Sequence, residues 1–423
     1  MPINLPESSQ KRIVIIGAGF AGLSFINRMK KSNYQLVLID RNNYHQFQPL
    51  FYQVAMAGLE PSSISFPLRK AYQGCNNIFI RVAEVEKIVP EEKKVITNLG
   101  YVNYDILLLA QGAATNFFGN LNLQQKTFGL KSVSESLALR NAILSDYEEA
   151  LTERDYHRRQ GLIDIVIVGG GPTGVELAGA LAEMKSFILP KDYRELDNKE
   201  VDIYLIQSGK NLLAGMSEKS SKKAHRFLEE SGVHVLTETR VTDYDGEWVS
   251  TDIGKKIKAQ KVIWAAGICG NDIPGIVEEC FGKGRRLKVD RYHLLESYDD
   301  IYAIGDIAYM EEEKYPQGHP QVAQVAIQQG KNLARNFIKK NKRKFSYKDK
   351  GSMATIGRNK AVVDLPSFSF TGFLAWVVWL FVHLFALIGV KNKIFVFINW
   401  VWNYITYDQS LRIILKAKER EAK

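Results

Sequence analysis

The chain has 423 residues, of which 46% are hydrophobic and 24% are charged, and it carries a formal net charge of +10 at pH 7. This length predicts two or three domains, and this composition excludes a disordered or low-complexity protein. A basic balance suits nucleic acid, an anionic membrane or acidic ligands, but the sequence has no zinc-finger or RNA-binding motif, so we expect no nucleic-acid partner.

The N-terminus and the cysteines bear on the compartment. Residues 1–10 have neither the apolar core of a signal peptide nor the Arg-rich amphipathic character of a transit peptide. Cys75, Cys269 and Cys280 form no CxxC pair and no cluster with metal-ligand spacing. We therefore expect a bacterial cytoplasmic setting for the body of the protein, with no disulfide and no metal site.

The first predicted elements are a strand, a glycine turn, a helix and a second strand. Arg12 to Ile16 is a short buried strand, Gly17 to Gly22 is a GxGxxG turn, and Leu23 to Met29 is a helix. The second strand, residues 35–39, ends in Asp40. This order of elements around a GxGxxG motif is typical of a dinucleotide-binding unit.

Each residue of this fingerprint has a physical role. Gly17 permits the tight turn, Gly19 lets the backbone approach a pyrophosphate, and Gly22 lets the helix pack closely on the strand. The free N–H groups and positive dipole at the helix N-terminus attract phosphates. Asp40 is predicted to accept hydrogen bonds from a ribose.

The same pattern returns about 150 residues later, as the residue numbers show. Residues 164–168 are a predicted strand, residues 175–184 a helix and residues 201–206 a second strand. Gly169, Gly171 and Gly174 stand at the three glycine positions of the turn between the first strand and the helix. Two fingerprints in one chain are more specific than one, and they predict two dinucleotides held face to face, one fixed and one exchanging.

Gln207 follows the second strand where an acidic residue would discriminate against a 2′-phosphate. Because glutamine is neutral, that like-charge repulsion is missing, and NADPH stays open beside the favoured NADH. Alternatively, Gln207 hydrogen-bonds the ribose as an acid would.

Three later segments extend the resemblance to the flavoprotein reductases that have two dinucleotide-binding domains, one for FAD and one for NAD(P)H. Residues 106–110, ending in Ala110 and followed by Gly112, resemble the crossover that leaves the FAD half. Residues 262–266 with Gly267 resemble its counterpart in the NAD half. Residues 301–304 with Gly305 and Asp306 resemble the late FAD motif, after which a helix N-terminus points at the flavin.

Within that superfamily, the chain resembles the type II NADH:quinone oxidoreductases over nearly its whole length. The resemblance rests on residues 43–55, residues 321–330 (QVAQVAIQQG) and the tail from Gly372 to Tyr404. It implies hydride transfer from NADH to FAD, then two-electron reduction of a membrane quinone without proton pumping. It further implies cofactor contacts by Gln48, Ala323 and Gln324, a quinone-head site at Gln324 and Gln328, and a carboxylate near the nicotinamide and quinone at Glu176.

These roles have structural alternatives. Glu176, on the first turn of its helix, is either a proton relay for the quinone or a partner of a helix N-terminus. Gln324 and Gln328, spaced i and i+4 on one helical face, either contact the quinone or are ordinary flavin packing or surface residues. His319 and His383 are expected to be structural.

The tail combines a long apolar segment with aromatic and basic flanks. Residues 371–390 are almost wholly apolar apart from His383, Lys391 and Lys393 interrupt, and residues 394–407 carry Trp and Tyr. Aromatic residues favour the headgroup level and basic residues favour anionic lipids. A helical pair lying in one leaflet is favoured, and a spanning helix or an apolar dimer interface are the alternatives.

The predicted fold is α/β, with two Rossmann-like domains and a C-terminal helical membrane-anchoring region. We expect an FAD-binding domain in residues 1–118 and 286–345, a connecting helical segment in 119–160, an NAD(P)H-binding domain in 161–285 and the anchor in 346–423. The family suggests a homodimer, bound peripherally to the cytoplasmic face of a bacterial inner membrane.

Rival functions share parts of this pattern. A sulfide:quinone reductase has the flavin fold but redox cysteines that are missing here, and a disulfide reductase needs a CxxC pair. A ferredoxin or rubredoxin reductase needs no apolar tail. A redox-sensing flavoprotein that binds both cofactors and turns over slowly is left open.

Overall fold

The computed structural model describes residues 1–339, 341–408 and 411–415, and these fold into two compact units. Each unit is assembled from three separate segments of the chain. Unit 1 contains residues 1–45, 66–114 and 268–349, and unit 2 contains residues 46–65, 115–267 and the chain from 350 onward. Four short strands lie where the chain passes between the units: β3 (Tyr44–Gln46), β4 (Ser65–Pro67), β10 (Ala113–Thr115) and β18 (Ile268–Gly270).

Unit 1 is built on a parallel sheet whose strands are near-continuous apolar runs, as a sheet buried on both faces requires. Its order is β21-β9-β1-β2-β5. The strands are β1 (Arg12–Ile16), β2 (Gln35–Asp40), β5 (Ile78–Val82), β9 (Ile106–Leu109) and β21 (Ile301–Ala303).

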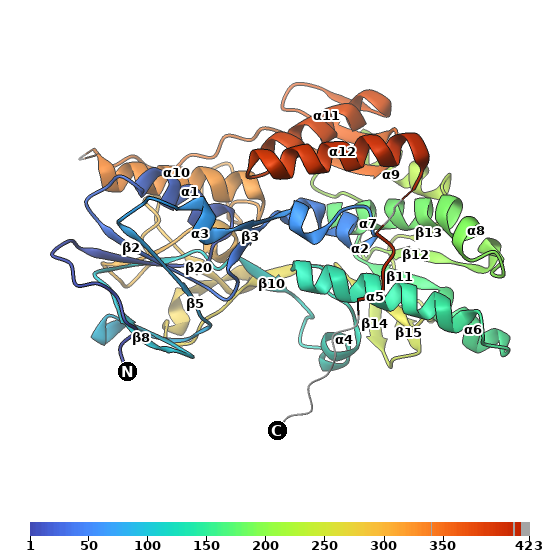
Figure 1. Cartoon of the computed structure of the whole chain (residues 1–423), viewed down its shortest axis with the longest axis horizontal. Helices are drawn as coiled ribbons and strands as arrows, with labels where there is room; N and C mark the ends of the chain where they lie inside the picture. Colours follow the sequence, from blue (N-terminus) through green and yellow to red (C-terminus); the bar gives the residue numbers. More distant parts are fainter. Residues whose placement is uncertain (340, 409–410, 416–423) are drawn as a thin grey trace. The chain divides into compact units, whose positions relative to one another are not determined.

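Helices and a small antiparallel sheet cover the two faces of this sheet. Helices α1 (Phe20–Met29) and α10 (Ala323–Ile338) lie together on one face (Figure 1). Gly330 permits their close contact, because a Cβ there would lie 2.4 Å from the Ala21 carbonyl oxygen. The other elements are α3 (Leu68–Ala71), the sheet β6 (Val85–Val89), β7 (Lys94–Thr97) and β8 (Gly100–Asn103), and the strands β19 (Phe281–Gly282), β20 (Arg286–Lys288) and β22 (Ala308–Tyr309).

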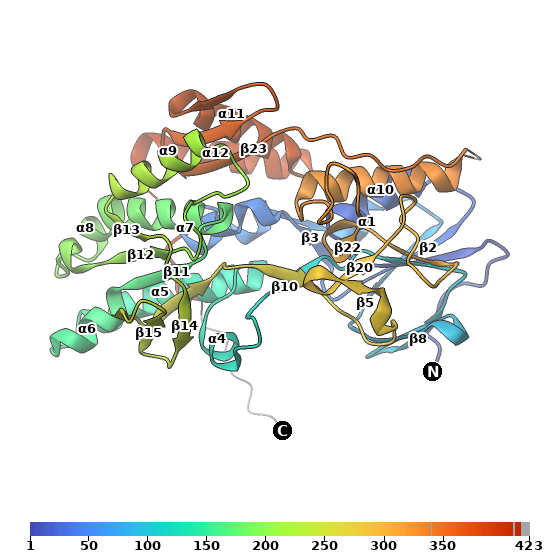
Figure 2. The ribbon, with the colours of Figure 1, turned by 180° about the vertical axis from the view of Figure 1, so that it is seen from behind.

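Unit 2 repeats the scheme with a four-stranded parallel sheet in the order β13-β12-β11-β17. Figures 1 and 2 show α7 on one face of this sheet and α5 on the other. The strands are β11 (Ile165–Val168), β12 (Ile203–Ile206), β13 (Val233–Leu236) and β17 (Lys261–Trp264). The helices are α2 (Phe51–Ala55), α4 (Leu121–Lys126), α5 (Val133–Ala150), α6 (Tyr156–Ile163), α7 (Pro172–Glu183), α8 (Leu189–Asp192) and α9 (Glu218–Glu229).

The last part of unit 2 joins an antiparallel sheet to two apolar helices. This sheet contains β23 (Ser352–Gly357), β24 (Lys360–Asp364) and β25 (Ser369–Thr371). Unit 2 has another small antiparallel sheet earlier in the chain, with β14 (Val241–Tyr244), β15 (Trp248–Thr251) and β16 (Lys256–Lys258). The helices are α11 (Phe373–Ala386) and α12 (Val390–Thr406). Among the described residues, no helix combines the length and apolar character needed to cross a bilayer.

The α/β class with two Rossmann-like sheets and a helical C-terminal region is confirmed, but the structure divides the chain differently from the predicted domain boundaries. Residues 46–65 belong to unit 2, because Gln53 accepts a hydrogen bond from the Trp400 indole at 2.8 Å. Residues 268–285 belong to unit 1, where Cys280 is buried in the core and a Cβ at Gly275 would lie 1.8 Å from the Ile88 carbonyl oxygen.

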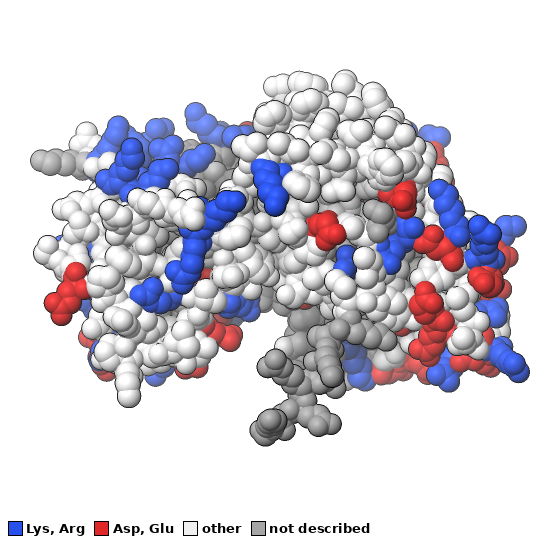
Figure 3. Space-filling model, in the orientation of Figure 1, with Lys and Arg blue, Asp and Glu red and all other residues white. Residues whose placement is uncertain are grey.

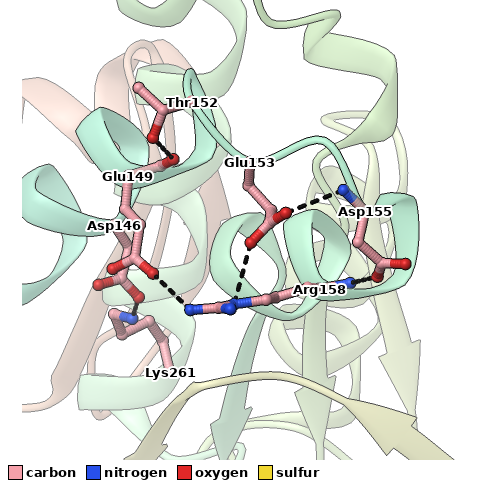
Figure 4. Close-up of polar contacts among 7 residues, drawn as sticks. All are labelled: Asp146, Glu149, Thr152, Glu153, Asp155, Arg158 and Lys261. Atoms are coloured by element: carbon pink, nitrogen blue, oxygen red, sulfur yellow. Dashed lines mark hydrogen bonds and ion pairs between the residues drawn. The ribbon is translucent and has the colours of Figure 1, made fainter.

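A polar network ties the predicted connecting segment to the second sheet. The Lys261 ammonium on β17, only 5% exposed, pairs with the Asp146 carboxylate on α5 (Figure 4). Burial lowers the pKa of Lys261 to about 8. One turn further along α5, Glu149 receives a longer contact of 3.4 Å from Arg158 on α6, and both of these side chains are exposed.

We expect Asp146→Asn to lower the free energy of unfolding by about 3 kcal/mol, because it leaves the buried Lys261 ammonium without a counter-charge. Glu149→Gln, which breaks the exposed pair in the same network, is expected to cost under about 0.5 kcal/mol. Urea denaturation of both variants measures the difference. Equal, small losses would contradict a buried ion pair at Lys261.

Candidate functional site

The first glycine turn, Gly17 to Gly22, is called the first cradle here, and its three motif glycines have different surroundings. Gly17 has φ +103°, and a Cβ there would lie 2.4 Å from the Ala110 carbonyl oxygen. A Cβ at Gly22 would lie 2.1 Å from the Gly17 carbonyl oxygen, whereas a Cβ at Gly19 would meet no protein atom within 4 Å. Gly17 and Gly22 are therefore fixed by the fold, and the space at Gly19 is left for a ligand.

The second glycine turn repeats this geometry in unit 2. Gly169 has φ +116°, and its Cβ would lie 2.4 Å from the Ala265 carbonyl oxygen. A Cβ at Gly174 would lie 1.9 Å from the Gly169 oxygen, and a Cβ at Gly171 would meet nothing within 4 Å. In both cradles the first and third glycines are required by the fold, and the second glycine leaves space for a ligand.

Both cradles fit a dinucleotide. Gly19 and Gly171 are the N-caps of α1 and α7, and neither helix has a side chain capping its first N–H groups. Uncapped N–H groups beside open space form an anion site suited to a pyrophosphate. The residues present therefore suit FAD in unit 1 and a nicotinamide dinucleotide in unit 2, as predicted.

Asp40 and Gln207 occupy equivalent places at the ends of the second strands. One Asp40 carboxylate oxygen accepts the Ala18 N–H at 2.7 Å, and the Gln207 amide oxygen accepts the Gly170 N–H at 2.8 Å. Burial raises the pKa of Asp40, while the N–H groups of Ala18 and Asn42 oppose the rise. Each side chain thus braces the residue that follows the first glycine of its cradle.

The crossover residues follow β9 and β17, the strands that pair with the first strand of each cradle, β1 and β11. Ala110 is buried, and its N–H donates to the Ile16 carbonyl at 2.8 Å, while Gly112 has φ +73° and open space around it. In unit 2, Gly267 has φ +157°, and its carbonyl accepts the Asn116 N–H at 3.1 Å.

The prediction that a helix starts directly after Asp306 is wrong. Asp306 lies in a 3-10 turn, Gly305–Ile307, which β22 and a loop follow, and α10 begins only at Ala323. Two glutamines tie α10 and its approach back to this turn. Gln321 donates to the Asp306 carbonyl at 3.0 Å, and the buried Gln329 accepts the Gly305 N–H at 2.7 Å.

The two glutamines predicted at the quinone head have partners within unit 1. Gln328 donates to the Lys348 carbonyl at 2.9 Å and accepts the Lys348 N–H at 3.1 Å, so both ends of its amide are engaged by backbone. Gln324 donates to the Asp349 carboxylate at a long 3.4 Å. Gln328 therefore holds the segment before the C-terminal sheet.

Glu176 lies in the interior of unit 2. One of its oxygens accepts the Trp379 indole N–H at 3.2 Å and the Thr355 N–H at 3.4 Å, so its partners are α11 and β23 rather than a helix N-terminus. Burial raises the pKa of Glu176 to about 8, and the two N–H donors oppose that rise. At neutral pH the carboxyl is mostly protonated and has a proton to give.

A cavity opens beside this carboxyl, and all of its lining belongs to unit 2. The walls come from α2, α7, the hairpin of β23 and β24, α11 and α12. Aromatic side chains dominate, among them Tyr52, Trp376, Trp379 and Trp400, and the polar members include Glu176 and Glu183. An apolar, aromatic cavity with a few polar groups suits a flat ligand that carries carbonyl oxygens.

The remaining predicted residues have varied settings. Gln48 is exposed on a 3-10 turn, Gln48–Leu50. His383 stacks on Trp379 with ring centroids 4.0 Å apart, and burial lowers its pKa to about 4. His319 is buried and contacts Glu312 at 2.8 Å. Gln329, Trp379 and Glu183 also belong to this arrangement but were not predicted, and only the glutamine-rich run 321–330 carried a signal for any of them.

Comparisons with known proteins agree with this arrangement. The pyridine nucleotide-disulphide oxidoreductase family model matches residues 11–330, and the NDH2 C-terminal domain model matches residues 350–406. All three cysteines of this chain are free, so the disulphide chemistry in the first family's name has no cysteine pair here.

Relatives and solved structures cover most of the chain. It is 32% identical to a type II NADH:quinone oxidoreductase of Mycobacterium tuberculosis, over 93% of this chain and 88% of the relative. It is 27% identical to a mitochondrial internal alternative NAD(P)H-ubiquinone oxidoreductase of Arabidopsis thaliana, over 94% and 85%. The fold matches that of NDH2 from Plasmodium falciparum in complex with NADH, with a TM-score of 0.88, 21% identity and coverage of 96% and 100%. A sulfide:quinone oxidoreductase of Aquifex aeolicus shares the fold less closely, with a TM-score of 0.72, 18% identity and coverage of 94% and 95%.

Proposed function

The chain belongs to the type II NADH:quinone oxidoreductases, and from that premise we propose that it reduces a membrane quinone with NADH through FAD, without translocating ions. The observation that carries the proposal is the pair of glycine cradles, together with a buried, protonated carboxyl at an aromatic cavity. The test is NADH-driven reduction of a short-chain soluble quinone by the full chain. Oxidation of NADH by artificial acceptors alone would contradict it.

Bound FAD supplies the redox chemistry, accepting the hydride of NADH and passing two electrons to the quinone. The protein contributes binding and orientation. The N–H groups at the starts of α1 and α7 would hold the two pyrophosphates, and the turn at Asp306, braced by Gln321 and Gln329, lies in the unit that would hold the flavin. No protein nucleophile enters this scheme.

We place the quinone head at the unit 2 cavity, with Glu176 as its proton donor. The protonated carboxyl lies in the cavity wall, where Trp379 and Thr355 fix its orientation through hydrogen bonds. Quinone reduction consumes two protons, and a donor whose pKa is about 8 is matched to neutral pH. Gln324 and Gln328 do not line this cavity; their place at the quinone head stays a prediction, and Gln328 holds the backbone of Lys348.

Gln207 determines how the coenzyme is selected. Its amide oxygen is engaged by Gly170, which leaves the amide N–H groups for the ribose and places no negative charge near a 2′-phosphate. We expect Gln207→Glu to raise the preference for NADH over NADPH at least roughly tenfold, through like-charge repulsion. Values of kcat/KM for both coenzymes at fixed ionic strength measure it, and an unchanged ratio would mean that residue 207 does not face the ribose.

We propose that the exposed face of α11 and α12 binds a lipid surface. Its large apolar side chains are mostly more than half exposed, including Phe385 at 68% and Ile405 at 72%, and they form an uncharged area over these helices (Figure 3). Lys391 and Lys393 lie at this face, each with its ammonium over a phenylalanine ring, at 5.3 and 5.6 Å. Apolar and aromatic side chains with adjacent lysines suit an anionic membrane interface.

We expect replacement of Phe381, Phe385 and Ile398 by serine to abolish sedimentation of the protein with anionic vesicles while soluble-quinone activity is retained. None of the three lines the cavity. The matched control replaces Leu99, Leu121 and Ile253, which are equally exposed elsewhere. Undiminished vesicle binding would contradict the lipid assignment, and dissociation of a dimer on size-exclusion chromatography would assign the face to a second copy.

A further inference from the structure

Helix α7 carries a second carboxyl on the face that holds Glu176. Glu183 is seven residues further along, and Ala180 lies between the two carboxyls; all three line the same cavity. Residues at i and i+7 face the same side of a helix and are about 10 Å apart along its axis. The cavity therefore has one carboxyl at each end of a two-turn stretch of α7.

The hairpin of β23 and β24 holds both carboxyls in the same way. Glu176 accepts the Thr355 N–H, and Glu183 accepts the Arg358 N–H in a short contact. Gly179 makes this docking possible, because a Cβ there would lie 2.4 Å from the Ile356 carbonyl oxygen. The positions of the two carboxyls are thus fixed by one rigid backbone segment.

The two carboxyls differ in their access to solvent. Glu176 is buried, whereas Glu183 is partly exposed. The helix changes character directly after Glu183, where residues Met184–Ile188 form a π-helix before Pro190. A wider turn there accommodates a proline, which lacks an N–H and crowds the preceding turn. Of the two carboxyls, Glu183 is therefore the one that solvent can reach.

Positively charged groups of the hairpin lie near Glu183. Burial raises the pKa of Glu183, and Arg358 and Lys360 of the hairpin oppose the rise. The Arg358 guanidinium lies over the rings of Tyr404 of α12 and of Tyr407, the residue that follows this helix, at 3.9 and 3.8 Å. The other titratable groups facing this end are Tyr52 of α2, which interacts with both carboxyls, and Glu176 itself.

We propose that Glu183 is a second proton carrier for quinone reduction, passing protons from solvent to Glu176 through water in the cavity. The inference rests on the proposed function and extends it by one residue. The overall reaction, NADH + H⁺ + quinone → NAD⁺ + quinol, withdraws one proton from solvent in each turnover. Glu183 gives its proton to the Glu176 carboxylate formed when the quinone is protonated, and it is then reprotonated from solvent. Polar groups at both ends of the cavity provide the partners that such water needs.

The test is Glu183→Gln, with Glu229→Gln, an exposed acid on α9, as the matched control. Reoxidation of the reduced protein by a short-chain quinone is expected to slow at least tenfold, with an increased solvent isotope effect, while reduction by NADH is unchanged. Glu183→Asp is expected to restore part of the rate. In infrared spectra of the resting protein, the variant is expected to lose one carboxyl C=O band that titrates with pH.

Three outcomes separate the possibilities. An unchanged quinone half-reaction and an unchanged infrared titration in Glu183→Gln would overturn the relay and leave the proposed function intact. A parallel loss of both half-reactions with a lowered Tm would show that Glu183 only holds the hairpin, which also overturns the relay. Failure of the unsubstituted protein to reduce quinone would contradict the proposed function itself.

Discussion

Replacing Gly171 with valine is expected to raise the KM for NADH at least tenfold while FAD content and stability are unchanged. A Cβ at this position meets no protein atom within 4 Å, and its φ of −74° with ψ of −179° is extended backbone that valine adopts readily. The side chain would instead occupy the space through which the coenzyme pyrophosphate approaches the N-terminus of α7. A tenfold loss corresponds to about 1.4 kcal/mol of binding.

Two further substitutions distinguish a loss of coenzyme binding from a loss of folding. Gly215→Val is the control, because Gly215 also has no protein atom within 4 Å of its Cβ but lies outside the cradle. Gly174→Ala is expected to disrupt the fold of unit 2, since its Cβ would lie 1.9 Å from a backbone oxygen. An unaltered KM in Gly171→Val with normal flavin content would show that the second cradle does not bind the coenzyme.

Glu176→Gln is expected to slow quinone reduction about 100-fold, the scale of a lost general acid, with hydride transfer from NADH unchanged. Because the raised pKa of about 8 keeps the carboxyl protonated at neutral pH, the quinone half-reaction of the unsubstituted protein is expected to decline above pH 8. The variant is expected to have a flat pH profile. Stopped-flow measurement of the two half-reactions between pH 6 and 10 tests this, and equal losses in both would contradict a proton-donating role.

A second variant fixes the sign of the effect. The Trp379 indole N–H stabilises the charged carboxylate and so lowers the pKa of Glu176. Trp379→Phe is expected to move the alkaline decline of quinone reduction to higher pH.

The stability of the protein gives an independent measurement. Between pH 4.5 and about 8 the folded state keeps a proton on Glu176 that the unfolded state has released, so this carboxyl lowers Tm as pH rises. Glu176→Gln removes that dependence.

The two glycine turns could be predicted from sequence because each motif stands in one short segment between a strand and a helix. Gly17, Gly22, Gly169 and Gly174 are glycines because a Cβ would collide with backbone only a few residues away or on the adjacent strand. Predicted and observed strands agree closely, for example residues 12–16 for β1 and 164–168 against 165–168 for β11.

The cavity beside Glu176 could not be predicted from sequence because distant segments build it. Trp379 reaches Glu176 across more than 200 positions, and the hairpin at Thr355 and Arg358 docks on α7 from a similar separation. Gly179, which permits that docking, is one ordinary small residue in an apolar helix. The helix predicted directly after Asp306 was wrong, although Pro316, Gly318 and Pro320 mark the segment before Ala323 as a loop, and the glutamine helix expected at residues 321–330 corresponds to the first half of α10.

The division of the chain also depends on tertiary contacts. Residues 46–65 follow the first Rossmann strands in sequence, yet Asn403 of α12 donates to the Gly58 carbonyl at 3.3 Å, and α2 packs against α5 and α7. Apolar residues in this stretch indicate burial but not the partner. The order of the Rossmann elements along the chain therefore does not reveal that these residues pack within unit 2.

The most direct test of the central claim is to follow flavin absorbance in the purified full chain under anaerobic conditions, first with NADH and then with a short-chain quinone. Rapid bleaching by NADH followed by full recovery on addition of quinone is the predicted result, and it would establish both half-reactions in one sample. Bleaching without recovery would contradict the quinone assignment and direct the search to another acceptor.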